Sequence, residues 1–265
     1  ELRLQAAKIE VAMARSLLEQ ARLLTHDERL KQQTMEQLRS AIEAIREVDR
    51  ALARESRLIL ARFRSRPAAI SPYRHRQLQN ETKLLLGTLN ADLAEVGVVD
   101  LTAKRTPLRE AKRIAETMSR GTADDLTDWK ARLLAIRCDR LRGDLAAAKT
   151  KLEQWNDEFP QELKTDVRAE EALILLADNR PDQVVENLRA LRKQNGVLTG
   201  RLALLYLRGL GELWQAVVLK GEPELAKQLF EQLTLAAEQT QEEIGGIWSY
   251  RCQLYLQLMQ QAQRF

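Results

Sequence analysis

The sequence is poor in the residues that end secondary structure. Its 265 residues include only 11 glycines and 6 prolines, and aromatic residues make up 5%. Strands are bounded by turn formers and are rich in β-branched and aromatic residues, so few strands are expected. The rest of the composition, 45% hydrophobic and 30% charged, is typical of long helices joined by short connections. The sequence therefore predicts an all-α fold.

Histidine and cysteine are scarcer still, which restricts the chemistry that the chain can support. His26 and His75 are the two histidines, and Cys138 and Cys252 are the two cysteines. Neither type has the spacing of a zinc site, and no Gly-x-x-x-x-Gly-Lys-Ser/Thr loop for binding phosphate is present. Both histidines are expected in solvent, and both cysteines are expected as buried free thiols. We therefore expect no catalytic, metal-binding or cofactor-binding residues, and a protein that is not an enzyme.

Long apolar runs are also lacking. No window approaches 18 consecutive apolar residues, so no membrane-spanning helix is expected. The sequence opens at Glu1 rather than at methionine, and a targeting segment that had been removed would leave no trace in it. The compartment is therefore left open between the cytoplasm and the periplasm.

The first 66 residues have the pattern of two long helices. Residues 2–24 carry apolar side chains at helical spacing, and Thr25 or Asp27 is suited to cap a second helix. In that second helix, a narrow seam repeats in alternating steps of three and four residues, as in a coiled coil. Its members are Met35, Leu38, Ile42, Ile45, Asp49, Leu52, Ser56, Ile59 and Phe63. The seam is expected to pack on residues 1–24 or on another chain, and the second option would produce self-association.

Prolines divide the rest of the chain. Two of them in residues 64–73 mark the predicted end of the first segment, and residues 67–106 are interpreted as a linker and a connecting helix. A loop is expected over residues 97–106, with Pro107 in the first turn of the next helix. Residues 107–265 are then expected to form antiparallel helices, because short turns rich in Gly, Pro and Asn recur between them. These helices are predicted at about 107–119, 123–142, 145–158, 161–178, 182–194, 198–219, 223–240 and 244–263.

Three of the turns are followed by small and bulky residues at the same offsets. The sets are Gly143 with Leu145, Ala148, Leu152 and Trp155; Asn179 with Pro181, Val184, Leu188 and Leu191; and Gly221 with Pro223, Ala226, Phe230 and Leu233. This pattern resembles the tetratricopeptide repeat over about residues 107–240, and the resemblance implies helix pairs stacked as a superhelix. The last helix is expected to be a cap or the first helix of a further pair, whose open apolar face would drive self-association.

The resemblance also implies a function. Tetratricopeptide-like repeats hold a protein or peptide in a groove, so we expect a non-catalytic protein–protein interaction scaffold or adaptor. The first helix of each pair builds the inner surface of such a stack. Its polar residues, expected to be exposed, are the candidate partner-binding residues: Arg132, Arg137, Arg140, Glu170, Arg201 and Arg208.

The alternative function is based on charge. Residues 1–76 contain 16 Lys and Arg against 10 Asp and Glu, and from Arg50 to Arg76 eight arginines face the single acid Glu55. This basic patch comprises Arg50, Arg54, Arg57, Arg62, Arg64, Arg66, Arg74 and Arg76. Such a cluster can bind phosphates, which predicts a nucleic-acid-associated or regulatory helical protein, or one that binds an anionic membrane. A solvated face, pairing within the chain and an acidic protein partner are the other interpretations.

Overall fold

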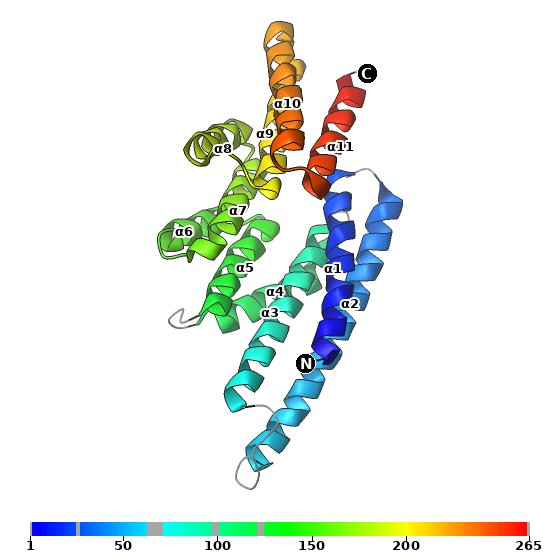
Figure 1. Ribbon diagram of the computed structural model, residues 1–265, viewed down its shortest axis with the longest axis vertical. Helices are drawn as coiled ribbons and strands as arrows, with labels where there is room; N and C mark the ends of the chain where they lie inside the picture. The colour runs from blue at the N-terminus through cyan, green and yellow to red at the C-terminus, as the bar shows by residue number, and fades with distance from the viewer. Residues whose placement is uncertain (1, 25–26, 63–70, 97–100, 121–124, 264–265) are drawn as a thin grey trace. The chain divides into compact units, whose positions relative to one another are not determined.

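The protein is all-helical, as the shortage of turn formers predicted. The computed structural model describes residues 2–24, 27–62, 71–96, 101–120 and 125–263 (Figure 1). Within these ranges there are eleven α-helices and one short 3-10 helix, and there is no strand. The chain separates into two compact units, residues 1–144 and residues 145–265.

The described residues of the first unit form five helices. They are α1 (Leu2–Leu23), α2 (Glu28–Arg62), α3 (Pro72–Val96), α4 (Leu101–Met118) and α5 (Leu126–Arg142). Each helix contacts the next along the chain, and α3 also contacts both α1 and α5. The expected boundaries near residues 66 and 106 both fall inside this unit, since α2, α3 and α4 pack on one another.

The seam predicted on α2 has its partners within the chain. Leu38, Ile42, Ile45 and Leu52 are buried in one apolar core with residues of α1 and α3, including Val11. Met35, Asp49 and Ser56 are partly buried, whereas the side chains of Ile59 and Phe63 lie outside the described part of the chain. Of the two expected arrangements, the structure therefore has the one in which residues 1–24 cover the seam, with α3 as a second partner.

Helix α4 begins earlier than predicted. The expected loop over residues 97–106 is wrong in its second half, because the helix starts at Leu101 and Pro107 lies inside it. A proline in this position removes the backbone bond to the carbonyl of residue 103. Pro107 does lie near the start of a helix, but in its second turn rather than in the predicted first turn.

The second unit contains the remaining helices. They are α6 (Leu145–Trp155), the 3-10 helix η1 (Gln161–Leu163), α7 (Lys164–Ala177), α8 (Pro181–Asn195), α9 (Gly200–Lys220), α10 (Pro223–Glu243) and α11 (Gly246–Gln263). These bounds agree with the predicted ones within a few residues. Helix α9 is central, since it contacts α7, α8, α10 and α11. Among the helices described, α9 alone is long and apolar enough to cross a membrane, but 56% of that window is buried. We therefore interpret α9 as the core helix of this unit.

The three turns that share a sequence pattern also share a backbone conformation. Gly143, Asn179 and Gly221 all adopt the left-handed conformation, with φ of 82°, 57° and 75°. In each turn this residue donates a backbone hydrogen bond to the carbonyl three residues earlier, and the following residue donates to the carbonyl five residues before itself. This is the Schellman arrangement, which satisfies carbonyls at the end of the preceding helix. The small residues five positions later, Ala148, Val184 and Ala226, are all buried.

The shared turn conformation leads to a stability prediction at Asn179, the one described non-glycine residue with positive φ. Replacing Asn179 with alanine should lower the free energy of unfolding by about 1 kcal/mol, because a Cβ without a compensating polar group disfavours the left-handed region. Replacement with glycine should be neutral or stabilising by a few tenths of a kcal/mol. Urea unfolding of the three proteins measures the difference. Equal stability of the alanine variant and the wild type would mean that this turn is not left-handed in solution.

Candidate functional site

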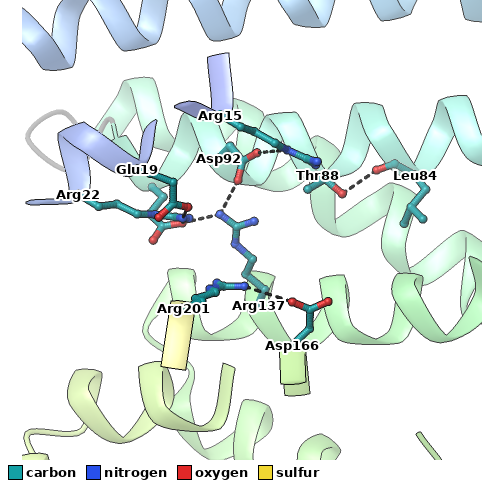
Figure 2. Close-up of polar contacts among 10 residues, drawn as sticks. Arg15, Glu19, Arg22, Leu84, Thr88, Asp92, Arg137, Asp166 and Arg201 are labelled. Carbon is teal, nitrogen blue, oxygen red and sulfur yellow. Dashed lines mark hydrogen bonds and ion pairs between the residues drawn. The ribbon is translucent and has the colours of Figure 1, made fainter. Parts of the chain in front are cut away.

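Buried ion pairs join the three odd-numbered helices of the first unit (Figure 2). Arg22 of α1 places Nη2 2.7 Å from the Oε2 atom of Glu95 in α3. Arg137 of α5 contacts the same carboxylate and lies 2.6 Å from the Oδ1 atom of Asp92. The exposed fractions of the Arg22, Glu95, Arg137 and Asp92 side chains are 19%, 16%, 12% and 3%. We call these four residues the ion network.

Further charges surround the ion network. Arg15 places Nε 3.7 Å from the second carboxylate oxygen of Asp92, and Glu19 pairs with Arg22. At another point of the same unit, Lys112 of α4 contacts Asp139 of α5 at 2.7 Å, and that aspartate is 1% exposed. Buried charges are tolerated only when they are paired in this way. Apart from the Glu19–Arg22 pair within α1, these ion pairs act between helices.

The pKa values follow from this arrangement. Burial alone would raise the pKa of Glu95, but the guanidinium groups of Arg22, Arg137 and Arg140 outweigh burial and hold it well below its ordinary value. Burial would lower the pKa of Arg22, yet Glu95 and Glu19 raise it above the ordinary value. Glu95 is therefore ionised at neutral pH and is already neutralised by arginines. Such a carboxylate is suited to fixing helices and is poorly suited to exchanging protons with a substrate near neutral pH.

Two of the three predicted partner-binding residues of α5 lie at the ion network. Arg137 belongs to it, and Arg140 acts on Glu95. Arg132 is half-buried, and its guanidinium carbon lies 4.5 Å from the ring centroid of Trp129. The expectation that these residues are exposed is wrong for Arg137, since three helices meet around it. The sequence reasoning placed these arginines on an exposed inner surface of the helix stack, and it did not show the acids of α3 that Arg137 and Arg140 meet.

The predicted partner-binding residues of the second unit differ in environment. Glu170 is 3% exposed, so its predicted exposure is wrong, because this face of α7 is turned into the unit. Arg201 and Arg208 of α9 are about one third exposed. Arg201 lies 3.6 Å from Asp166 of α7 (Figure 2), and Arg208 lies 3.7 Å from Glu212. Both arginines are therefore half-buried and paired with an acid.

The basic patch is partly described. Arg50, Arg54, Arg74 and Arg76 are exposed on α2 and α3, and Arg50 pairs with Glu43 at 3.2 Å. The side chains of Arg57 and Arg62, together with Arg64 and Arg66, lie outside the described residues.

His75 is buried, contrary to the expectation that it is solvated. Its side chain lies on the face of α3 that meets α2, and Nε2 is 2.7 Å from Oγ of Ser56. Ser56 also accepts a hydrogen bond from Gln79 at 2.8 Å, so the seam of α2 contains a small polar cluster at Ser56. His26 lies outside the described residues. Within the described ranges, no group of three or more His, Cys, Asp and Glu has the arrangement of a metal site.

The two cysteines are buried free thiols, as predicted. Burial raises the pKa of Cys252 to about 11, so this thiol is protonated and unreactive at neutral pH.

An open groove lies between α7 and α8 of the second unit. Its cavity has a volume of about 230 Å³. The apolar floor consists of Ala172, Leu175, Val184, Leu188 and Leu191, and the polar rim includes Arg168, Glu171, Asn187 and Gln194. We call it the α7–α8 groove. Sequence reasoning missed it, although Leu188 and Leu191 belong to the repeated pattern, because the depth of a groove depends on how far two helices separate.

Comparisons with known proteins do not assign the chain to a family. No family model, no curated protein and no solved structure matches it.

Proposed function

We propose that the protein is a non-catalytic scaffold that holds a protein partner in the α7–α8 groove. The observation that carries this proposal is the open apolar floor of the groove, where Leu175 and Leu191 are only partly buried. Apolar surface of this kind, surrounded by polar residues, is typical of a binding groove for a peptide or a partner helix. Asn187 and Gln194 on the rim offer amide groups that can bind a partner's backbone.

We further propose that the stack is of the tetratricopeptide type. Three observations support this: equivalent left-handed turns, buried small residues at equal offsets, and contacts of α9 with both α7 and α11. In such a stack the odd-numbered helices form an inner layer. Arg201 and Arg208 would then contact a partner that extends beyond the α7–α8 groove.

A photo-crosslinking amino acid at Asn187 tests the scaffold proposal in the protein's native cell. We expect it to capture a specific partner, and Leu191→Lys to abolish the crosslink because a charge replaces part of the apolar floor. Titration of the purified partner should then show at least tenfold weaker binding, about 1.4 kcal/mol.

Leu219→Lys is the matched control, because Leu219 is 88% exposed on α9 and lies outside the groove. It should leave the crosslink and the affinity unchanged. An Asn187 crosslink that persists in Leu191→Lys, or the lack of any specific crosslink, would reject the groove as the binding site.

Nucleic-acid binding remains the alternative function. The exposure of Arg50, Arg54, Arg74 and Arg76 supports it. Titration with single-stranded and duplex oligonucleotides at two salt concentrations separates it from the scaffold, because binding to phosphates weakens steeply with salt.

A further inference from the structure

A second hollow lies in the first unit, between α2, α3 and α4. Its volume is about 360 Å³. Ile42, Leu93 and Pro107 provide apolar surface in it, and Asn90 and Thr106 add polar groups. Its charged lining comes from the flanking helices: Arg39, Glu43 and Arg46 from α2, and Arg109 and Glu110 from α4. We call it the arginine hollow.

The charges of the arginine hollow are unbalanced. Glu43 forms ion pairs with Arg46 at 3.6 Å and with Arg50 at 3.2 Å. Glu110 forms an ion pair with Arg113 at 2.9 Å. The hydrogen bond from Arg113 is the main reason why the pKa of Glu110 is lowered, and Arg46 and Arg109 contribute to the same effect.

Two arginines of the hollow have no acidic partner among the described residues. Arg39 and Arg109 are exposed, and neither forms an ion pair with any residue that the structure describes. They come from different helices, Arg39 from α2 and Arg109 from α4. Each guanidinium presents several donors in a plane, which suits a carboxylate or a phosphate. The hollow therefore combines two available cations with apolar surface.

We propose that the arginine hollow binds an acidic segment of a partner protein. An apolar side chain of that segment contacts Ile42, Leu93 and Pro107, while flanking carboxylates pair with Arg39 and Arg109. Charge complementarity favours an acidic partner, and the apolar surface favours a protein. A nucleic-acid backbone fits less well, because Glu43 and Glu110 would face its phosphates and the apolar surface would have no counterpart.

This inference does not rest on the α7–α8 groove. The two surfaces belong to different units and bind different chemistry: the groove offers an apolar floor, and the arginine hollow offers two available cations. Variants of one surface leave the other intact, so each proposal can fail while the other stands.

The test uses the full chain and four labelled probes. The first probe is a twelve-residue peptide rich in glutamate, with leucine at every fourth position, and the second is its twin with glutamine in place of glutamate. A single-stranded RNA and a duplex DNA complete the set. Fluorescence anisotropy at low and at physiological salt should show binding of the acidic peptide only. Arg39→Glu/Arg109→Glu should weaken that binding at least tenfold.

A control of equal charge change is available in the second unit. Lys220 and Lys227 are exposed, so Lys220→Glu/Lys227→Glu alters the net charge by the same amount far from the hollow in sequence. It should change the affinity less than twofold, and circular dichroism should show that both double variants are folded. Three outcomes would overturn the proposal: equal binding of the glutamine peptide, an equal loss in the control variant, or tighter binding of either nucleic acid through Arg39 and Arg109.

Discussion

Replacing Glu95 with alanine is expected to lower the free energy of unfolding of the first unit by about 3–5 kcal/mol. The carboxylate of Glu95 lies between Arg22 and Arg137, and its side chain is 16% exposed. Without it, two guanidinium groups from α1 and α5 face each other with little access to solvent, while Glu19 still pairs with Arg22 and Asp92 with Arg137. The variant should lose protection from amide hydrogen exchange in α1, α3 and α5 first, which can be measured by mass spectrometry.

Glu81→Ala is the matched control. Glu81 is also on α3 and pairs with Lys8 of α1 at 2.6 Å, but the two side chains are 42% and 34% exposed. Exposed pairs of this kind contribute about 0–1 kcal/mol, because water screens the charges. If Glu95→Ala is no more harmful than Glu81→Ala, the ion network does not hold the three helices together.

The same residue sets a pH dependence with a defined sign. Because the folded protein holds the pKa of Glu95 below its unfolded value, the ionised group stabilises the fold above about pH 4.3. That contribution is lost as the pH falls through the lower, folded pKa. The stability advantage of the wild type over Glu95→Gln should therefore be full at pH 7 and shrink under acid conditions, as measured by urea unfolding across pH. An advantage that grows below pH 4 would contradict this assignment.

Gly200→Ala is expected to destabilise the second unit by about 2 kcal/mol. A Cβ at this position would lie 2.2 Å from Cγ, 2.3 Å from Cδ1 and 2.7 Å from Cβ of Trp248 in α11. The last of these atoms is next to the backbone, so the indole cannot move aside without moving α11. Alanine is otherwise the better helix former, and a simple propensity argument would predict the opposite sign. Thermal unfolding should show a midpoint lowered by roughly 6–10 °C.

Two further variants make this prediction specific. Thr199→Ala changes an exposed neighbour that makes no capping hydrogen bond, and it should alter stability by less than about 0.5 kcal/mol. The double variant Gly200→Ala/Trp248→Leu should be less unstable than the sum of its single changes, because the smaller side chain makes room for the new methyl group. Full additivity would mean that α9 and α11 are not in close contact at this point in solution.

The helices of residues 126–263 could be predicted well because their ends depend on local chemistry. A residue in the left-handed conformation, such as Gly143 or Gly221, ends a helix by itself. The small and bulky residues at equal offsets after each of the three turns then indicate which face of the following helix is buried. The glycines of Gly209-Leu210-Gly211 allow close packing of side chains from other helices against α9. Tyr255 lies where a Cβ on Gly211 would be, and Val184 and Val185 lie against Gly209.

The ion network could not be predicted in the same way. Asp92 and Arg137 are 45 residues apart, and nothing local in either segment identifies the other as its partner. The resemblance to a helical repeat placed the arginines of α5 on an inner surface, yet burial and pairing depend on which acids of α3 lie near them. His75 shows the same difficulty, since its neighbours in sequence are arginines and its partner in space is Ser56.

The order of helix contacts has a kinetic consequence. In both units, the α-helices in substantial contact are next to each other along the chain or separated by one α-helix. Such contacts close short loops, and chains rich in them cross a low entropic barrier to folding. Each unit should therefore fold quickly and open from its outermost helices, with α3 and α9 the last to lose their structure.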